Sequence, residues 1–276
     1  MTRRGRSLAN PIDVQHATAT VVEGSFVAVQ YHSVYIMVFS GTDRDARRQA
    51  LAAKRDDDLE KPMSVLSSAA YVFPLVDRSR ITNEVTRLLI DDIERFRRTL
   101  GAICHVRLPL IREVIGSEIP PHLVSTREGT PYMQLLEPRG NVLFSNLVTE
   151  LEAAGINYVN ATSLNFAGES EITDPAAAEA FCAEAEVPLL LHDPLFAAKD
   201  VIGSFPAVDV ERSAAVRGGH VPLELIDRLV GVKFDRTNAT PEKHPHSEFL
   251  LSLIEQPDLK GEGLRETILC HFYRSH

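Results

Sequence analysis

Residues 25–39, SFVAVQYHSVYIMVF, contain two apolar runs, SFVAVQ and VYIMVF, that are rich in β-branched and aromatic residues. Such runs predict extended strands. The polar segment that follows predicts a helix through DRDARRQALAAK, with Thr42 as its expected N-cap. A strand pair followed by a helix is typical of α/β domains, so this stretch indicates the fold class.

The alternation of strands and helices continues to about residue 231. Strand candidates KPMSVL, AICHVRL, INYVNA and VPLLLHD alternate with helix candidates ITNEVTRLLIDDIERFRRTLG, NLVTELEAAG, AAAEAFCAEAE and LELIDRLVG. The first of these helices is expected to be continuous and to end at Gly101, and Asp174 with Pro175 predicts the start of a later one. Because AVDVE and SAAVRGG follow without helical spacers, we expect a mixed sheet flanked by helices.

The chain is expected to have three parts: an N-terminal arm of residues 1–20, an α/β domain of residues 21–231, and a linker with a C-terminal appendage of residues 232–276. Residues 111–140 contain four prolines and predict an irregular insertion. The appendage has apolar segments, so it needs a surface to cover. Docking on the domain and docking on a second subunit, which would make a homodimer, both stay open.

Composition limits the classes of function. With 44% hydrophobic and 24% charged residues, the composition is that of a globular domain. No apolar run approaches the roughly 20 residues that span a bilayer, and the basic start has no apolar secretory region. We therefore expect a cytoplasmic protein without a membrane partner. The net charge of −9 argues against broad affinity for nucleic acid, but a local basic groove for a nucleotide stays possible.

Several familiar kinds of site are not indicated. The three cysteines, Cys104, Cys182 and Cys270, have neither disulfide nor zinc spacing, so no structural metal is expected. His244 and His246 lack a third ligand at suitable spacing and favour a polar linker. No dinucleotide-binding glycine motif, P-loop or nucleophile elbow is present. His192 and Asp193 end a strand and are interpreted as a turn, with an acid/base pair as the alternative.

The loop SLNFAGES, residues 163–170, follows a strand candidate directly. Ser163 and Asn165 would offer a hydroxyl and an amide, and Gly168 would let the backbone approach an anionic ligand closely. An ordinary surface turn uses the same residue types. The loop alone does not decide between the two interpretations.

Five segments in a fixed order resemble the YrdC-like family. They are HSVYIMV, AAKRDDDLEKPMSVL, CHVRLPL, SLNFAGES and AVRGG, and together they extend over about residues 24–231. That family includes the threonylcarbamoyl-adenylate synthases, which help make the threonylcarbamoyl-adenosine modification of tRNA. The resemblance implies a single α/β domain with a twisted, mixed sheet flanked by helices around a concave basic pocket.

The resemblance also implies an activity. It would be that of a nucleotidyltransferase that converts ATP, bicarbonate and threonine to threonylcarbamoyl-adenylate and pyrophosphate, with Mg²⁺ carried by the nucleotide. It designates no catalytic side chain. The residues that it implies for nucleotide binding are Lys54, Arg55, Lys61, Ser163, Asn165 and Arg217, and those for substrate binding are Ser33, Tyr35 and Arg107.

Each of these residues also has a structural interpretation. KRDDDLEK could be a solvated helix end, since its charges compensate one another. Arg107 ends an apolar strand and needs an anion, which could be a ligand or a structural ion pair. Arg217 could be a solvated loop arginine, and Tyr35 a core residue of its strand.

Departures from the family pattern leave two alternatives to threonylcarbamoyl-adenylate synthesis. QYHSVYI stands where the family has Pro-Thr-(Asp/Glu)-Thr-Val-Tyr-Gly, KRDD stands in place of Lys-x-Arg-Pro, and a Pro-Gly-Pro element is absent between residues 85 and 101. These changes affect the expected amino-acid and phosphate sides of the pocket. The first alternative is a protein that binds a nucleotide or RNA without turnover. The second is an enzyme of the same type with another amine acceptor.

Overall fold

The computed structural model describes residues 5–58 and 63–273 of the chain. The chain divides into two compact units, each described here by itself. Unit 1 comprises Met1–Ser67 and Asn141–Phe196, and unit 2 comprises Ser68–Gly140 and Ala197–His276. Among the described residues, no helix has both the length and the apolar character needed to cross a membrane.

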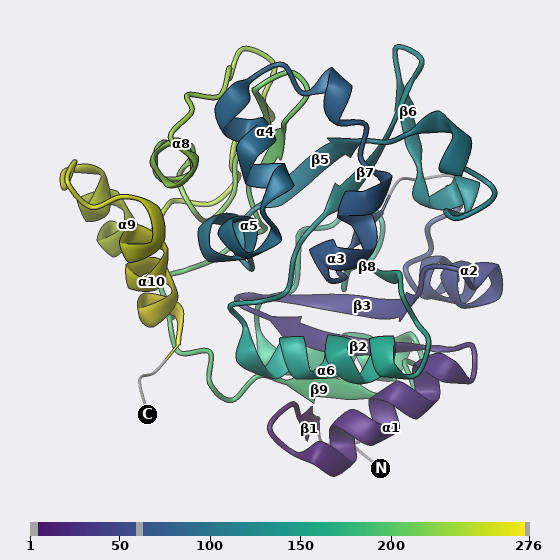
Figure 1. Ribbon diagram of the computed structural model, residues 1–276. Helices are drawn as coiled ribbons and strands as arrows, with labels where there is room; N and C mark the ends of the chain where they lie inside the picture. The colour runs from purple at the N-terminus through teal and green to yellow at the C-terminus, as the bar shows by residue number, and fades with distance from the viewer. Residues whose placement is uncertain (1–4, 59–62, 274–276) are drawn as a thin grey trace. The chain divides into compact units, whose positions relative to one another are not determined.

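Unit 1 is a mixed sheet with helices on both faces (Figure 1). Its strands are paired in the order β1-β9-β2-β3-β8-β4, with β9 parallel to β1 and β2 and the remaining pairs antiparallel. The mixed sheet expected from the sequence is therefore confirmed. The elements are β1 (Arg6–Ser7), α1 (Pro11–Val22), β2 (Phe26–Tyr31), β3 (Val34–Ser40), α2 (Arg44–Ala53), β4 (Ser64–Val65), α6 (Val142–Ala153), β8 (Val159–Ser163), α7 (Pro175–Glu184) and β9 (Leu190–His192).

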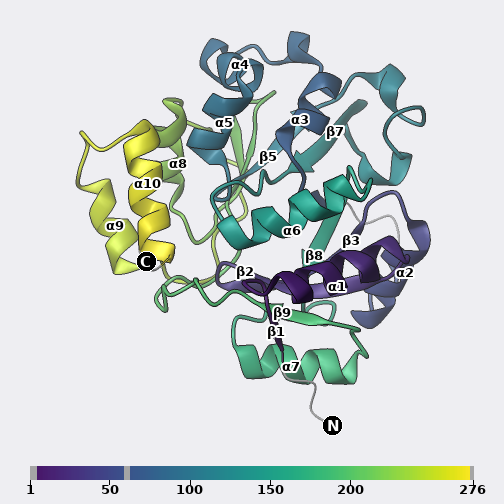
Figure 2. The same cartoon turned by 60° about the horizontal axis from the view of Figure 1, so that its bottom comes forward.

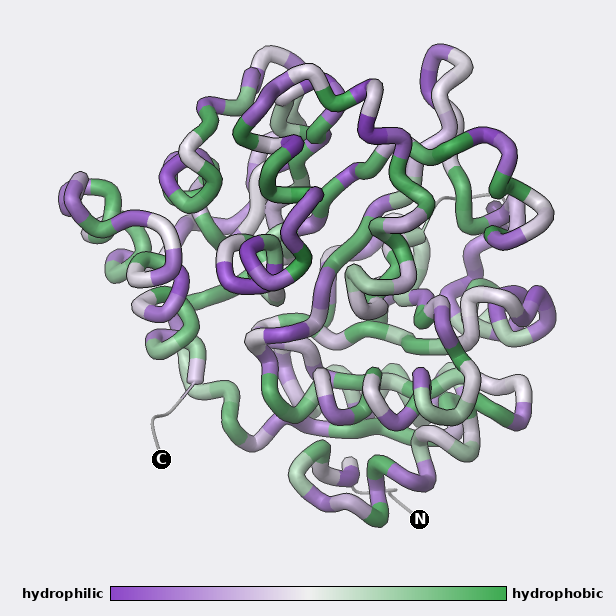
Figure 3. Tube along the Cα trace, viewed as in Figure 1, coloured by the Kyte–Doolittle hydropathy of each residue, from purple (hydrophilic) through white to green (hydrophobic). Residues whose placement is uncertain are grey.

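The helices of unit 1 cover its sheet from two sides (Figure 2). Strand residues that alternate along β2 and β3 point to opposite faces. On one face Met37 packs with Leu51 of α2 and Phe181 of α7 in a continuous buried cluster. On the other face Tyr31 meets Phe144 of α6 edge to face, with ring centroids 4.5 Å apart. Both faces of β2 and β3 are thus buried, which explains why these strands are apolar along most of their length (Figure 3).

Capping side chains fix the helix starts in unit 1. Asp174 accepts a hydrogen bond from the backbone N–H of Ala177 at 2.8 Å, which confirms it as the N-cap of α7. The prediction that Thr42 caps α2 is wrong. The cap is its neighbour Asp43, whose carboxylate accepts from the Asp45 and Ala46 N–H groups at 2.8 and 3.0 Å. A carboxylate bonds these positively polarised N–H groups better than a hydroxyl does.

Unit 2 combines a second set of paired strands with a group of helices. The strand order is β6-β7-β5-β10-β11, in which only β5 and β10 run parallel. The helices are α3 (Ala69–Val72), α4 (Glu84–Asp91), α5 (Ile93–Leu100), α8 (Leu223–Val230), α9 (Glu248–Ile254) and α10 (Gly261–Phe272). The strands are β5 (His105–Pro109), β6 (Ser125–Arg127), β7 (Thr130–Leu135), β10 (Ala207–Asp209) and β11 (Ala214–Arg217).

The helix expected over residues 81–101 is interrupted. Asp92 has extended backbone angles, φ −120° and ψ 100°, and separates α4 from α5. Its carboxylate accepts from the N–H of Arg95 at 3.0 Å, so it acts as the N-cap of α5. The prediction of a continuous helix is wrong because the periodicity of apolar residues continues through the break, whereas the capping aspartate starts a new helix.

Residues 111–140 are irregular up to Val124 and then form an unexpected hairpin of β6 and β7. The two turn residues, Glu128 and Gly129, have φ of 50° and 80°. Positive φ at both positions is the conformation that the right-handed twist of a tight hairpin requires. The Glu-Gly pair between alternating residues was the local signal for this turn.

Helix α10 packs on α5 and α8 within unit 2. Its Arg265 is buried and donates from Nη2 to the carbonyl oxygens of Gly101 and Arg139 at 3.1 and 2.8 Å. The carbonyl of Gly101 follows the end of α5, where cations are favourable. The domain boundaries expected at residues 20 and 231 stay predictions.

Candidate functional site

Lys54 brings the loop after β8 into contact with the end of α2. Its ammonium donates to the backbone carbonyl of Ser163, to Ser163 Oγ at 3.3 Å and to Asn165 Oδ1 at 3.2 Å. Lys54 is only 2% exposed, so these oxygens hold a buried positive charge. The structure therefore brings together three of the residues predicted to bind a nucleotide.

The loop closes around this ammonium through its own hydrogen bonds. Asn165 Nδ2 donates to the carbonyls of Phe166 and Glu169, both at 2.9 Å. The N–H of Ala167 donates to the Lys54 carbonyl at 2.9 Å, and Gly168 takes a φ of 85° that favours glycine. The polar residues of SLNFAGES thus serve to hold the loop, and a phosphate that met Lys54 would replace one of these contacts.

Arg55 lies beside the same loop and is exposed. Its guanidinium carbon is 4.2 Å from the centre of the Phe166 ring, and its Nη2 donates to Glu184 at 2.6 Å. The side chain is 67% exposed, so it can exchange these partners at little cost. Lys61, the third cation of this predicted group, lies outside the described residues.

Tyr35 lies under the loop, in the core of unit 1. Its carbonyl accepts from the N–H of Leu164 at 2.8 Å, and its hydroxyl contacts His192 Nδ1 at 2.7 Å and Gln30 Oε1 at 3.2 Å. Burial raises the pKa of the Tyr35 hydroxyl far above its ordinary value and lowers that of His192. Ser33 is buried in the turn between β2 and β3.

His192 and Asp193, weighed as an acid/base pair, have separate partners. His192 Nε2 lies 3.8 Å from the carboxylate of Glu179. Asp193 is buried and accepts from Asn141 Nδ2 at 3.2 Å and from the N–H of Leu195 at 2.9 Å. Burial raises the pKa of Asp193 above its ordinary value. These contacts tie the end of β9 to the start of α6, as expected of a strand-end turn.

Arg107 lies in unit 2, in a narrow pocket on one face of the strands. It pairs in register with Asp209 of β10 on one side and Gln134 of β7 on the other. Its guanidinium carbon lies 5.2 Å from the centre of the Tyr132 ring. The pocket is lined by Arg107, Pro109, Arg127, Thr130, Tyr132, Asp209, Glu211 and Arg212.

Arg107 is partly buried, and its Nε is a buried donor that makes no hydrogen bond within the described part of the chain. Such a donor costs about 1–3 kcal/mol unless an acceptor reaches it. Asp209 Oδ1 accepts instead from the N–H of Arg212 at 3.2 Å. Burial raises the pKa of Asp209, although the charges of Arg107 and Arg127 oppose that shift. Arg107 Nε could therefore donate to one further acceptor, but the pocket encloses only about 10 Å³, room for one water molecule.

Sequence reasoning identified Arg107 and missed the side chains around it. Thr130 and Tyr132 come from the unexpected hairpin, and Arg127 pairs in register with Thr130. Asp209 stands in the expected strand AVDVE, but nothing local indicates that it faces Arg107. Register across three strands creates this pocket, and register is not visible in a single segment.

Arg217 ends β11, away from the Arg107 pocket. Its Nε donates to the Phe205 carbonyl at 2.9 Å. A Cβ on Gly219 would lie 2.0 Å from the Pro206 nitrogen, so this close backbone packing requires glycine at position 219. Nearby, burial lowers the pKa of His105 well below its ordinary value and that of His220 to about 4.

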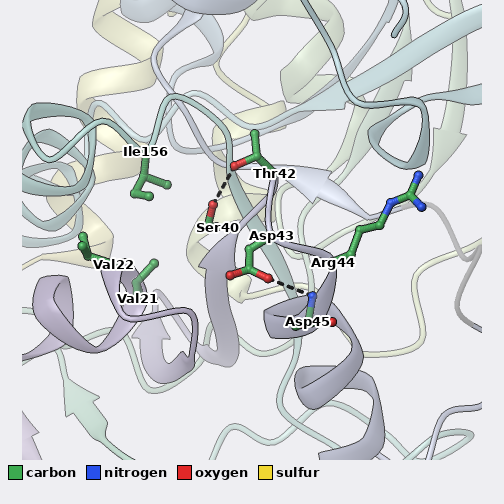
Figure 4. A pocket seen from close by; sticks show the side chains of 8 residues that line it. All are labelled: Val21, Val22, Ser40, Thr42, Asp43, Arg44, Asp45 and Ile156. Carbon is green, nitrogen blue, oxygen red and sulfur yellow. Dashed lines mark hydrogen bonds between the residues drawn. The ribbon is translucent and has the colours of Figure 1, made fainter.

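Unit 1 has a depression that, unlike the Arg107 pocket of unit 2, is a poor site for an anion (Figure 4). It lies where β3 meets α2, and Val21, Val22 and Ile156 form its apolar side. Three of its polar side chains are already used: Ser40 Oγ contacts Thr42 Oγ1 at 3.0 Å, and the Asp43 carboxylate caps α2. An anion would meet this carboxylate, so we do not consider it a candidate site.

Metal binding by the protein itself has no support in the described residues. Over residues 5–58 and 63–273, no group of three or more His, Cys, Asp or Glu side chains could hold a metal ion. His246, one of the two histidines of the expected polar linker, has a backbone partner: its Nδ1 lies 3.4 Å from the carbonyl of His220.

Similarity to solved structures identifies the fold. A crystal structure of Sua5 from P. abyssi complexed with L-threonine matches with a TM-score of 0.57 and 16% identity, over 95% of this chain and 86% of that one. The chain has the YrdC-like fold. A doubly substituted variant of the same protein matches with a TM-score of 0.60 and 17% identity, over 80% of this chain and 60% of that one.

A crystal structure of the hypothetical protein smu.1377c from Streptococcus mutans UA159 also matches, with a TM-score of 0.51 and 15% identity, over 83% of this chain and 95% of that one. No family model and no curated protein sequence matches the chain. The fold expected from the five ordered segments is thus confirmed by structure, at an identity too low to carry over an activity.

Proposed function

We propose that this chain forms a carbamoyl-adenylate from ATP, bicarbonate and a small amino acid, as a nucleotidyltransferase of the threonylcarbamoyl-adenylate synthase type. The observation that carries the proposal is the Arg107 pocket, in which a guanidinium donor is buried against an aromatic ring. Threonine is the first amino acid to test, because Sua5 with the same fold was crystallised with L-threonine. The product would serve the threonylcarbamoyl-adenosine modification of tRNA.

The proposed chemistry needs positioned charge rather than a covalent nucleophile. The amine nitrogen attacks the carbon of bicarbonate, and water leaves to give a carbamate. A carbamate oxygen then attacks the α-phosphorus of ATP, the bond to the bridging oxygen breaks, and pyrophosphate leaves with the nucleotide-borne Mg²⁺. Alignment and neutralisation of charge supply most of the rate in such phosphorus transfers.

Arg107 would bind the amino-acid carboxylate by a charge-assisted hydrogen bond. In unit 1 the loop at Ser163 and Asn165 would contact the nucleotide, with Lys54 and Arg55 supplying positive charge. The same proposal includes the roles that the family resemblance implies: nucleotide binding for Lys61 and Arg217, and substrate binding for Ser33 and Tyr35.

One observation favours a second candidate, a nucleotide- or RNA-binding protein without turnover. Lys54 and Arg55, two of the cations expected to meet the triphosphate, are engaged by oxygen atoms of the protein itself. If these contacts persist when a nucleotide binds, the leaving pyrophosphate loses part of its stabilisation.

Pyrophosphate release from ATP with bicarbonate, with and without threonine and then with a panel of other amines, tests the proposal. Release that depends on an amino acid supports the enzyme and identifies the acceptor. Nucleotide binding by calorimetry without release would support the second candidate. Lys54→Ala or Arg217→Ala should weaken nucleotide binding at least tenfold, the roughly 1.5–3 kcal/mol of a charge-assisted hydrogen bond. Arg48→Ala, at a side chain that is 64% exposed, is the control.

A further inference from the structure

The three most exposed large hydrophobic side chains in the described part of the chain lie on two helices of unit 1. Ile12 and Val22 of α1 are 60% and 50% exposed, and Val142 of α6 is 65% exposed. Exposed apolar side chains are ordinary when they are scattered singly, but α1 and α6 pack on each other. This helix pair therefore presents an apolar surface to solvent.

The two helices run side by side in the same direction (Figure 1 and Figure 2). Each has 12 residues and is about 18 Å long, at 1.5 Å per residue. Val22, at the end of α1, and Ile156, just after α6, line the same depression, so the C-terminal ends of the helices lie together (Figure 4). Ile12 and Val142 stand at the opposite, N-terminal end of the pair.

The C-terminal end of the pair is hollow and acidic. The depression there has a volume of about 500 Å³, and its charged residues, Asp43, Asp45 and Arg44, leave one negative charge in excess. Glu23 caps the end of α1 and Glu150 lies near the end of α6, and both are exposed. Neither helix has a basic residue in its last turn. The acidic side chains therefore add to the negative ends of two helix dipoles.

The N-terminal end of the pair projects and has the opposite electrostatic character. Ile12 and Val142 are its exposed apolar side chains. The carboxylate of Asp13 is compensated there, because Arg6 Nη1 lies 3.7 Å from its Oδ1 and the Ser7 N–H donates to its Oδ2 at 3.1 Å. The positive ends of both helix dipoles are then left in excess.

We propose that this helix pair is the contact surface of a homodimer, in which a twofold axis places the N-terminal end of each pair on the C-terminal end of the other. Ile12 would enter the depression of the second copy, against its apolar side. The positive helix ends would face the acidic ends of that copy, so the helix dipoles of the two copies would be antiparallel. Because both complementary ends lie on one helix pair, the contact occurs twice and the assembly closes at two copies.

Charge favours a second copy as the occupant of this surface. The chain has a net charge of −9, so two copies repel each other in general. At this surface the acidic end of one copy would meet the positive helix ends of the other, which offsets the repulsion. Two helices of this length form a contact smaller than a standard interface, so we expect a dissociation constant in the micromolar range. The inference is independent of the proposed activity.

Sedimentation velocity of the full chain, from low to high micromolar concentration, tests the dimer. The wild type should pass from monomer to dimer. Ile12→Glu should raise the dissociation constant about tenfold or more, because it brings a carboxylate to an acidic depression at both contacts. An acidic residue in the first turn of a helix is favourable, so the variant should keep its fold.

Two further variants make the outcome specific. Glu150→Lys should weaken the dimer at least threefold and leave thermal stability of the monomer equal or higher, because a cation suits the end of α6. Leu88→Glu, at a side chain of unit 2 that is 47% exposed, should leave the dimer unchanged. The inference is overturned if the wild type stays monomeric, which would assign the surface to another protein, or if it grows beyond a dimer. It is also overturned if folded Ile12→Glu dimerises like the wild type.

Discussion

Lys54 Nζ and Asn165 Oδ1 lie 3.2 Å apart although 111 positions separate the two residues in the chain. This contact joins the end of α2 to the loop after β8. The polar residues of that loop stabilise the fold because they accept hydrogen bonds from Lys54. A ligand that reached Lys54 would have to compete with the protein's own oxygen atoms. Substitutions at this contact can therefore show how much Lys54 contributes to the stability of unit 1, apart from any role in binding a ligand.

Lys54→Met should lower the free energy of unfolding by about 2–3 kcal/mol, because buried acceptors on Ser163 and Asn165 would lose their donor. Urea unfolding followed by circular dichroism measures this change. Arg55→Met, at the neighbouring exposed side chain, is the matched control and should cost less than about 1 kcal/mol. Equal small effects from both variants would contradict a structural role for Lys54.

His220 should make the stability of the chain depend on pH. Burial lowers its pKa in the folded state to about 4, from an ordinary value of 6.5. As pH falls from about 6.5 to about 4, the unfolded chain therefore binds a proton that the folded chain does not. The free energy of unfolding should decrease across this window by up to about 3 kcal/mol from this group.

Urea titrations of the wild type and His220→Gln at several pH values from 7.5 to 4 check this dependence. The wild type must be compared with the variant because other groups also titrate. Burial raises the pKa of Asp193 and Asp209, so these carboxylates raise the free energy of unfolding on acidification, whereas His220 lowers it. The variant should lose less stability than the wild type on acidification. Parallel pH profiles would rule out His220 as the titrating group.

Tyr35→Phe should lower the free energy of unfolding by about 1 kcal/mol. The variant removes the hydroxyl that contacts His192 at 2.7 Å and Gln30 at 3.2 Å, and leaves those groups partly unsatisfied. Thermal unfolding by calorimetry provides the comparison. Tyr71→Phe, at an exposed ring, should leave stability nearly unchanged. A Tyr35→Phe protein as stable as the wild type would mean that this hydrogen bond contributes nothing.

Asp92→Ala should cost about 0.5–2 kcal/mol, because α5 would lose the carboxylate that caps its first turn. Asp91→Ala is the neighbouring control, since Asp91 makes an exposed ion pair with Arg78 and should contribute less. Denaturant unfolding of both variants compares the two losses of stability. A larger loss of stability in Asp91→Ala than in Asp92→Ala would contradict a stabilising cap at the start of α5.

The sequence predicted those features whose signals are local. The paired strands β2 and β3 and the Asp174 cap of α7 each depend on a few neighbouring residues. The interruption at Asp92 was missed because apolar periodicity continues across it. The cap of α2 was placed one residue too early, at Thr42, because threonine is also a good N-cap residue. The five ordered segments predicted the YrdC-like fold because each segment keeps its place in the chain.

The candidate site was less predictable, because distant segments form it. Arg107 was identified from its polar side chain at an apolar strand end. Its neighbours Arg127 and Asp209 depend on the register of β5, β7 and β10 and on a hairpin turn, and neither residue stands out in its own segment. Conversely, nothing in AAKRDDD indicates that Lys54 is buried, since its acceptors come from a loop far along the chain.

The most direct test of the proposed activity is to incubate the chain with ATP, Mg²⁺, ¹³C-bicarbonate and a panel of amino acids, and to examine the products by mass spectrometry. We expect an adenylate that carries one ¹³C-labelled carbonyl group and the amino acid, formed together with pyrophosphate. The proposed activity would be contradicted if folded protein left ATP intact with every amino acid in the panel.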